Sequence, residues 1–246
     1  SLIRPEATGF GVLYYIQRVF EHERIELAGK TITVSGYGNV AWGVCKKAAE
    51  LGAKVVTISG HNGYVYDPNG IITEEKINFL LEMRASQKAN VKMYAEKFGC
   101  TFVARKKPWE VKADICIPCA TQNEVDLHEA EKMVQNGTRF YFEGANMPAT
   151  NEAIAYLQNQ GVLVGPAKAA NAGGVAVSAL EMSQNSERIH WSKEEVDTKL
   201  KEIMFNIVDV SYQASKRYGH PKDLVIGANI AGFEKVAEAM MAQGLI

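Results

Sequence analysis

The residues with the clearest chemical meaning form a glycine-rich turn that reads GYGNVA at positions 36–41. The turn follows an apolar run that ends at Ser35 and precedes a helical pattern that continues to about Leu51. In such a GxGxxA turn the first glycine permits a tight strand-to-helix connection, the second lets backbone N–H groups approach a pyrophosphate, and the small third residue allows close packing. A glycine turn can also be a plain chain reversal, but the order strand, turn, helix and strand favours dinucleotide binding. The residues expected to contact the cofactor here are Gly36, Tyr37, Gly38, Asn39 and Val40.

The choice between NAD and NADP is usually made at the end of the second strand of such a unit. An acidic residue there would bind the ribose 2′-hydroxyl of NAD, whereas a basic residue would bind the 2′-phosphate of NADP. This chain has Gly60, His61 and Asn62 at that place, with neither a carboxylate nor a Lys or Arg. His61 offers a positive charge only when it is protonated. The loop therefore favours NAD, and NADP stays as the alternative.

Cys116 and Cys119 formally match a CxxC motif for zinc or redox chemistry. A zinc site would need a second pair of ligands, but the five histidines are scattered without such spacing. A redox dithiol would have its first cysteine at a helix N-terminus, whereas this pair closes an apolar run that is typical of a buried strand. We therefore expect neither a metal site nor a redox dithiol.

Short apolar runs that are rich in β-branched and aromatic residues alternate with helical patterns over the first two thirds of the chain. This alternation is typical of βαβ units with a parallel sheet. The expected strands are 31–35, 54–59, 101–104, 114–117, 139–142 and 162–164. Helix boundaries are indicated by Thr73 before two glutamates, by Asp126 with Glu129 as a capping box, and by Gly99 as a helix stop. The predicted fold class is α/β, with a Rossmann-like, doubly wound and mostly parallel sheet.

Strand patterns end after Gly165, and the remaining third of the chain is helical in character. Ser192 and Glu195 form a second capping box. Apolar residues recur every three or four positions at Val196, Leu200, Ile203, Ile207, Val210 and Ala214, and then at Ile230, Phe233, Ala237 and Met240. We expect residues 1–246 to be one dinucleotide-binding domain, in which residues 166–246 form a helical layer packed on an α/β core of residues 1–165.

The composition excludes several classes of partner. The charged fraction of 22% and the formal net charge of −1 leave no basic stripe for nucleic acid. Apolar stretches are interrupted before the roughly 18 residues that a membrane helix needs, and the first residues lack a signal-peptide pattern. Four cysteines are too few for a disulfide scaffold. We therefore expect a cytoplasmic protein with no membrane or nucleic-acid partner.

Several separated motifs together are specific to one family. They are RPEATG at 4–9, GYGNVA at 36–41, PCATQN at 118–123, EGANMP at 143–148, KAANAGGV at 168–175 and GANIAGF at 227–233. This ordered set, which spans essentially all 246 residues, resembles the C-terminal half of hexameric glutamate dehydrogenases in the Glu/Leu/Phe/Val dehydrogenase superfamily. The resemblance implies a preceding domain with a catalytic Lys and a catalytic Asp. Neither has a counterpart here, so we expect a part of a longer protein, with no catalytic residue in this chain.

The resemblance also implies roles for individual residues outside the glycine turn. Thr8, Asn123 and Asn146 match positions on the cofactor side of the family's cleft. The expected substrate-binding residues are Arg4, Asn171, Gly174, Val175 and Ser178. Ser178 matches the contact to the side-chain carboxylate of glutamate, which leucine- and phenylalanine-type enzymes replace with apolar groups. The simpler alternatives are a helix serine that bonds its own turn, a helix position for Thr8, a helix start for Asn39 and a turn for Asn123.

The implied activity is reversible NAD(P)-dependent deamination of L-glutamate to 2-oxoglutarate and ammonium, by an intact homohexamer. Family members with a bulky aromatic at the position of Tyr37 and a Ser-Gly-x-x-Gly loop resemble the NAD-using branch. This chain would orient the nicotinamide and supply one wall of the substrate pocket, so alone it should be nearly inactive. Two alternatives stay open: another amino-acid dehydrogenase of the superfamily, and a non-catalytic nucleotide-binding module on the same fold.

Overall fold

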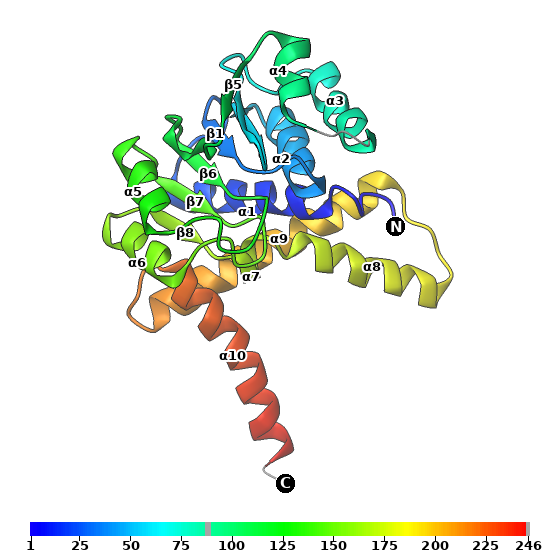
Figure 1. The fold of residues 1–246 in the computed structure, drawn as a ribbon. Helices are drawn as coiled ribbons and strands as arrows, with labels where there is room; N and C mark the ends of the chain where they lie inside the picture. Colours follow the sequence, from blue (N-terminus) through cyan, green and yellow to red (C-terminus); the bar gives the residue numbers. More distant parts are fainter. Residues whose placement is uncertain (87–89, 245–246) are drawn as a thin grey trace.

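The centre of the molecule is a five-stranded parallel sheet in the order β2-β1-β6-β7-β8. The computed structural model describes residues 1–86 and 90–244. The strands are β1 (Thr31–Val34), β2 (Lys54–Val55), β6 (Ile115–Ile117), β7 (Phe140–Phe142) and β8 (Leu163–Gly165). Helices cover both faces of the sheet (Figure 1). The predicted α/β, doubly wound class is confirmed.

Alternate residues of the central strands enter two separate hydrophobic cores. Ile115, Ile117 and Phe142 belong to the larger core, whereas Cys116 and Tyr141 belong to the smaller one. Because side chains alternate across a strand, each face of the sheet needs its own cover. The smaller core lies beneath α5 (Leu127–Gln135) and α6 (Asn151–Asn159). The larger core is covered by helices from the beginning of the chain, from the segment after the glycine turn and from residues 196–208.

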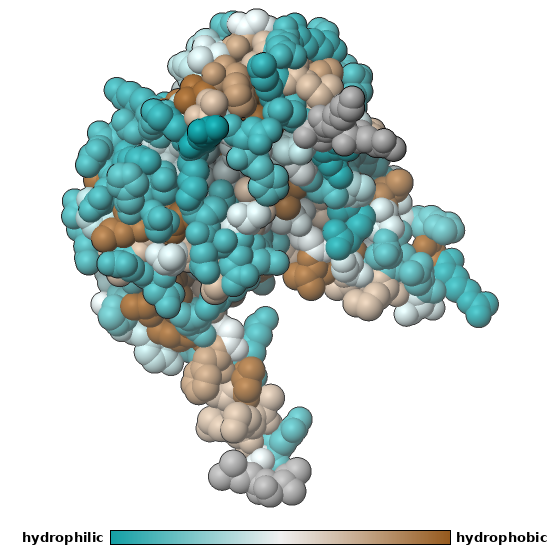
Figure 2. Space-filling model, viewed as in Figure 1, coloured by the Kyte–Doolittle hydropathy of each residue, from teal (hydrophilic) through white to brown (hydrophobic). Residues whose placement is uncertain are grey.

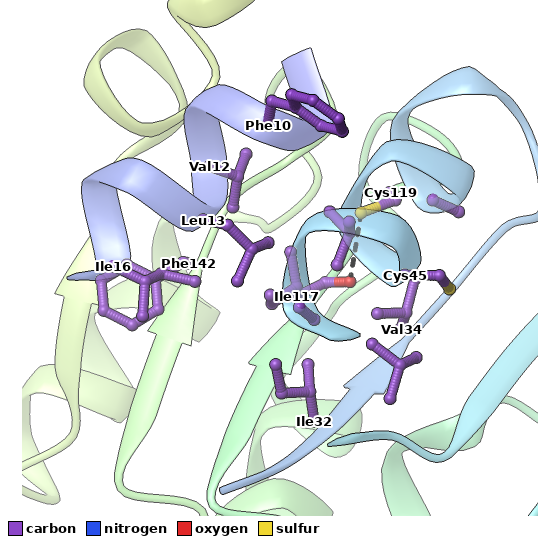
Figure 3. Close-up of a cluster of buried hydrophobic side chains, with 14 of the residues drawn as sticks. Phe10, Val12, Leu13, Ile16, Ile32, Val34, Cys45, Ile117, Cys119 and Phe142 are labelled. Atoms are coloured by element: carbon purple, nitrogen blue, oxygen red, sulfur yellow. Dashed lines mark hydrogen bonds between the residues drawn. The ribbon is translucent and has the colours of Figure 1, made fainter. Parts of the chain in front are cut away.

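The first helix, α1 (Ala7–Glu23), is the main cover of the larger core. Eleven of its 17 residues are buried, and Figure 3 shows Leu13 and Ile16 directed at the strands. α1 crosses α2 (Asn39–Glu50) where Gly9 faces Gly43: a Cβ on Gly9 would lie 2.4 Å from the backbone nitrogen of Val44. This close crossing holds the start of α1 beside the start of α2, which is the helix that follows the glycine turn.

The predicted strand 54–59 is wrong as one strand, because it divides at Val56 between two sheets. The Thr57 hydroxyl accepts the Val34 N–H at 2.9 Å and donates to the Val34 carbonyl at 3.0 Å, so a side chain replaces the backbone ladder to β1. The chain then continues as β3 (Thr57–Gly60), an unpredicted β4 (Gly63–Tyr66) and β5 (Thr101–Ala104), which form an antiparallel sheet. Strand 101–104 exists as predicted, but it lies outside the parallel sheet.

The remaining helices include those that the sequence indicates at Thr73, Gly99 and Ser192. They are α3 (Glu74–Ala85), α4 (Lys92–Phe98), the short 3₁₀ turn η1 (Pro108–Glu110), α7 (Ala167–Ala170), α8 (Gly173–Glu187), α9 (Lys193–Arg217) and α10 (Leu224–Gln243). Thr73 and Asp126 accept the expected N-cap hydrogen bonds, and Gly99 is a left-handed C-cap. The capping box predicted for Asp126 and Glu129 is only half formed, since the Glu129 carboxylate pairs with Lys132 at 3.2 Å instead. The capping box of Ser192 and Glu195 is confirmed.

The helix faces in the last third differ from the prediction. In α9 Val196, Leu200 and Ala214 are buried as predicted. Between them the buried positions are Met204, Val208 and Ser211, each one residue beyond the expected Ile203, Ile207 and Val210, which are half-buried. α10 buries Leu224 and Gly227 of its first turn, and its middle still contacts α9, where Arg217 pairs with Glu234 at 2.8 Å. The rest of α10 projects from the body with an apolar surface (Figures 1 and 2), and Phe233 is 67% exposed. No described helix is long and apolar enough to cross a membrane.

Candidate functional site

The sheet has a topological switch point between β1 and β6. These strands are neighbours, yet the chain leaves β1 toward β2 on one side and leaves β6 toward β7 on the other. In an open α/β sheet such a point, outside the carboxyl ends of the strands, is where ligands bind. The glycine turn follows β1, and the loop that begins at Pro118 follows β6.

Two cavities meet at this point. The first, of about 740 Å³, is lined by the glycine turn, by Ser59 to His61 and by the loop after β6; we call it the His61 cavity. The second, of about 630 Å³, is lined by the starts of α1 and α8 and by the loop after β7; we call it the Ser178 cavity. Both are lined by Cys119, Ala120 and Thr121, so residues 119–121 are a loop shared between them.

The glycine turn has the geometry that a pyrophosphate requires. Gly36 has a φ of 80°, and a Cβ there would lie 3.0 Å from the carbonyl oxygen of Cys119. At Gly38 an added Cβ would meet nothing within 4 Å, so the space above it is open. Gly38 is the N-cap of α2, with no side-chain cap and no acidic residue in the first turn. The first N–H groups of α2 are therefore available to an anion, which the helix dipole would also favour.

Most predicted site residues line one of these cavities. Those in the His61 cavity are Gly36, Tyr37, Gly38, Gly60 and His61. Those in the Ser178 cavity are Arg4, Thr8, Val40, Asn146, Asn171, Gly174, Val175 and Ser178. The folded chain thus brings together segments that are up to 174 positions apart, from Arg4 to Ser178.

Three predicted contacts line neither cavity. The Asn39 side chain accepts a hydrogen bond from the Arg84 guanidinium at the start of α2. Asn62 is in the β3–β4 turn, where its carbonyl accepts the backbone N–H of Arg105 at 2.8 Å. Asn123 is exposed in the left-handed region, with a φ of 54°. These positions agree with the simpler alternatives stated for Asn39 and Asn123, a helix start and a turn.

Four basic residues of the His61 cavity were not predicted: Arg84, Arg105, Lys106 and Lys107. They come from the end of α3 and from the loop after β5, far from the glycine turn in sequence. Lys106 pairs with Glu110 at 3.0 Å, and the Lys107 ammonium donates to the carbonyl of Glu124 at 2.7 Å. Although the loop at 59–63 contains no Lys or Arg, the folded cavity is therefore cationic.

The Ser178 cavity offers a set of small polar groups. The Ser178 hydroxyl donates to the Gly174 carbonyl at 3.1 Å, one helical turn back. The amide of Asn171 donates to the Ala145 carbonyl at 3.2 Å and to the Asn146 side chain at 2.8 Å. Arg4 adds a cation. Such a combination suits a small molecule that carries a carboxylate.

The two cysteines of the CxxC motif are buried, free thiols. Burial raises the pKa of Cys116 to about 11 and that of Cys119 well above its usual value. The Cys119 Sγ lies 3.5 Å from the carbonyl of Ile117 at the end of β6 (Figure 3). The strand interpretation of this segment is thus confirmed. Among the residues described, no cluster of His, Cys, Asp or Glu is arranged to hold a metal ion.

Comparison with known proteins gives consistent matches over the chain. The family model for Glutamate/Leucine/Phenylalanine/Valine dehydrogenase matches residues 1–244. An NAD-specific glutamate dehydrogenase from Clostridium symbiosum is 58% identical over 246 residues, and an NADP-specific one from Haemophilus influenzae is 50% identical over 250 residues. Each match covers 100% of this chain and 55% of the relative, so the chain spans about half the length of these curated relatives.

Solved structures match equally well. A glutamate dehydrogenase structure that is 58% identical superposes with a TM-score of 0.98, covering 100% of this chain and 55% of that one. Plasmodium falciparum glutamate dehydrogenase, at 45% identity, gives a TM-score of 0.96 and covers 100% of this chain and 53% of its own.

Proposed function

The chain belongs to the Glutamate/Leucine/Phenylalanine/Valine dehydrogenase family, and from this premise we propose that it is the dinucleotide-binding half of a glutamate dehydrogenase. The activity is the reversible deamination of L-glutamate to 2-oxoglutarate and ammonium. The observation that carries the proposal is the meeting of the two cavities at residues 119–121. A dinucleotide that follows the carboxyl edge of the sheet from the His61 cavity would place its nicotinamide beside a cavity suited to a small carboxylate.

When bound, NAD supplies the acceptor for the hydride that leaves Cα of glutamate. The residues of this chain bind and orient. The N-terminus of α2 holds the pyrophosphate, and Thr8 and Asn146 face the nicotinamide end. Ser178 and Arg4 bind the substrate carboxylates. None of the residues described as lining the Ser178 cavity is an Asp, Glu, His or Lys, so we assign proton transfer to the part of the longer protein that this chain does not span.

We propose NAD as the favoured cofactor. This assignment is supported by the absence of Lys and Arg from residues 59–63 and by the NAD-specific relative from Clostridium symbiosum. Other relatives are NADP-specific or NAD(P)-specific. The cationic residues of the His61 cavity would also tolerate a 2′-phosphate, although Arg84, Lys106 and Lys107 are already engaged by other groups. We therefore expect a preference for NAD rather than exclusion of NADP.

A pair of calorimetric titrations tests both parts of this proposal. The chain should bind NADH, and at pH 8 it should bind NADPH several-fold more weakly. Equal or tighter binding of NADPH would overturn the assignment of NAD, and failure to bind either dinucleotide would overturn the proposed function. A panel of L-glutamate, L-leucine and L-phenylalanine with the full-length protein then tests the substrate.

We also propose that the intact protein is a homohexamer in the cytoplasm. A related glutamate dehydrogenase from Thermus thermophilus, 25% identical with a TM-score of 0.79, is hetero-hexameric. The four free cysteines suit a reducing compartment. Analytical ultracentrifugation of the full-length protein would test the assembly.

A further inference from the structure

We propose that Glu124 is a positioning residue for dinucleotide binding, because its carboxylate fixes the shape of the shared loop, residues 119–121, which lies against the glycine turn. The inference rests on the proposed function and assigns a role to a residue that the sequence analysis did not single out. Glu124 lies in the loop after β6 and lines the His61 cavity, yet it is only 9% exposed.

The Glu124 carboxylate is bound by the backbone of its own loop. Its Oε1 accepts the N–H of Ala120 at 3.0 Å and the N–H of Thr121 at 3.3 Å. Asn123, with its left-handed φ of 54°, directly precedes Glu124 in this reversing loop. The carboxylate thus occupies the place of a bound anion in a nest of backbone N–H groups.

Ser35 connects this arrangement to the end of β1. Its hydroxyl accepts the N–H of Cys119 at 2.9 Å, and Ser35 also lowers the pKa of the neighbouring Glu124 carboxyl. Ser35 is 1% exposed and directly precedes Gly36. The end of β1 is therefore tied to the start of the shared loop through the Ser35 hydroxyl, while the Glu124 carboxylate binds the rest of that loop.

The position of the shared loop affects the glycine turn directly. A Cβ at Gly36 would lie 3.0 Å from the Cys119 carbonyl oxygen and 3.2 Å from the Cα of Ala120, so the two backbones are nearly in contact. A shift of the shared loop by a few tenths of an ångström would move the turn or change the width of both cavities. Since a dinucleotide must pass from one cavity to the other, this loop determines whether it fits.

The surroundings of Glu124 partly offset the cost of burying its carboxylate. Burial raises its pKa, and the hydrogen bonds from Ser35, Ala120 and Thr121, together with the charge of Lys107, oppose that effect. Removing the carboxylate would leave two backbone N–H groups without their acceptor, which is unfavourable in a buried loop. We expect the loop to relax toward the cavity in response.

Three variants of this chain test the role: Glu124→Ala, Glu124→Gln and Ser35→Ala. Glu129→Gln is the matched control, because Glu129 is 7% exposed on α5 and lines neither cavity. Binding of NADH and of AMP is measured by calorimetry at 25 °C, together with thermal melting. AMP is chosen because it can occupy the His61 cavity without crossing the shared loop.

Glu124→Ala should weaken NADH binding by about tenfold or more while changing AMP binding by less than about threefold, where tenfold corresponds to 1.4 kcal/mol. Glu124→Gln keeps an acceptor oxygen and should retain most of the affinity for NADH. The NADH affinity of Ser35→Ala should lie between those of the two Glu124 variants. Glu129→Gln should lower the melting temperature without changing either affinity. Should Glu124→Ala not fold, Ser35→Ala still decides the matter, because unchanged NADH binding by that variant would contradict the inference.

The inference is overturned if Glu124→Ala and Ser35→Ala bind NADH like the unaltered chain. It is also overturned if the control loses affinity as much as they do, because the effect would then be one of general stability. Failure of the unaltered chain to bind NADH is a separate outcome that overturns the proposed function.

Discussion

Gly36 and Gly38 lie two positions apart, but the structure requires them for different reasons. Gly36 has a left-handed φ and lies against the shared loop, so a side chain there would strain the fold. Gly38 has a φ of −75° and a ψ of −166°, which other residues adopt readily. The backbone therefore does not require a glycine at position 38; a glycine is explained there by the pyrophosphate that we propose to bind next to it.

Gly38→Val should abolish NADH binding and leave the fold intact, because the new side chain would fill the open space above the N-terminus of α2. Calorimetry would measure the affinity, and far-UV circular dichroism would check the fold. Gly36→Val is the comparison, and it should lower the melting temperature instead. Unchanged NADH affinity in a folded Gly38→Val protein would remove this turn from the site.

Ser178 is already hydrogen-bonded to Gly174, so a substrate carboxylate must compete with that bond. Ser178→Ala in the full-length protein should accordingly lower kcat/KM for glutamate by a factor that corresponds to about 1.5 kcal/mol of lost transition-state stabilisation, the low end of the range for a hydrogen bond to a charged group. Ser183→Ala is a matched control, because the exposed Ser183 hydroxyl bonds the Ala179 carbonyl of the same helix at 3.2 Å. An equal effect of both variants would assign Ser178 a helix role only.

Among the elements, α1 connects the site to the rest of the fold. It crosses α2 through the Gly9 and Gly43 contact and also packs on α8 and α9. Its far end is held to α9 by Arg18, whose guanidinium donates to both carboxylate oxygens of Asp209 at 2.8 and 2.9 Å. His22 lies 2.6 Å from the same carboxylate. This contact keeps α1 in place, and with it Thr8 at the Ser178 cavity.

Asp209→Asn should therefore lower the free energy of unfolding by about 1 kcal/mol at pH 7, as expected for a partly buried bidentate pair. The hydrogen bond from Arg18 is the main cause that lowers the pKa of Asp209. Because its pKa is lower in the folded state, Asp209 stabilises the fold at pH values above the pKa of about 3.9 that it has in the unfolded chain. This stabilisation is lost as the pH falls through the pKa of the folded state. Urea unfolding should show that the free energies of unfolding of the unaltered chain and of Asp209→Asn differ less at about pH 3 than at pH 7. An equal difference at both pH values would contradict the assignment.

At the scale of the whole molecule, two helices, α8 and α10, project from the body (Figure 1). Met241 on α10 is 84% exposed and Val175 on α8 is 70% exposed. The apolar surface along α10 (Figure 2) is unusual for a free monomer. The chain spans about half the length of its curated relatives, so it offers one wall of the proposed site.

The isolated chain should bind NADH but show no more than trace oxidation of glutamate. The residues described as lining the Ser178 cavity include no carboxylate, imidazole or amine to transfer protons. A steady-state assay that follows NADH formation would measure this, with the full-length protein as the positive control. Turnover within about tenfold of the full-length protein would place the catalytic groups in this chain after all.

The features that the sequence predicted correctly are those set by local patterns. The glycine turn after Ser35, the caps at Thr73 and Ser192 and the stop at Gly99 each depend on a few adjacent residues and their backbone hydrogen bonds. The family motifs named most residues that line the two cavities. Through the resemblance, residues as far apart in the chain as Arg4 and Ser178 were predicted to belong to one site, and both line the Ser178 cavity.

Only the tertiary structure decided the features that depend on distant segments. The predicted strand 54–59 divides at Val56 because the Thr57 hydroxyl takes over the contact with Val34, which periodicity cannot show. Arg84 and Lys107 make the His61 cavity cationic because α3 and the loop after β5 fold over it. The role proposed for Glu124 also depends on tertiary structure, because the loop that its carboxylate binds lies against the glycine turn. Local backbone geometry is encoded within a few residues, but the charge and shape of a cavity arise where separate segments pack together.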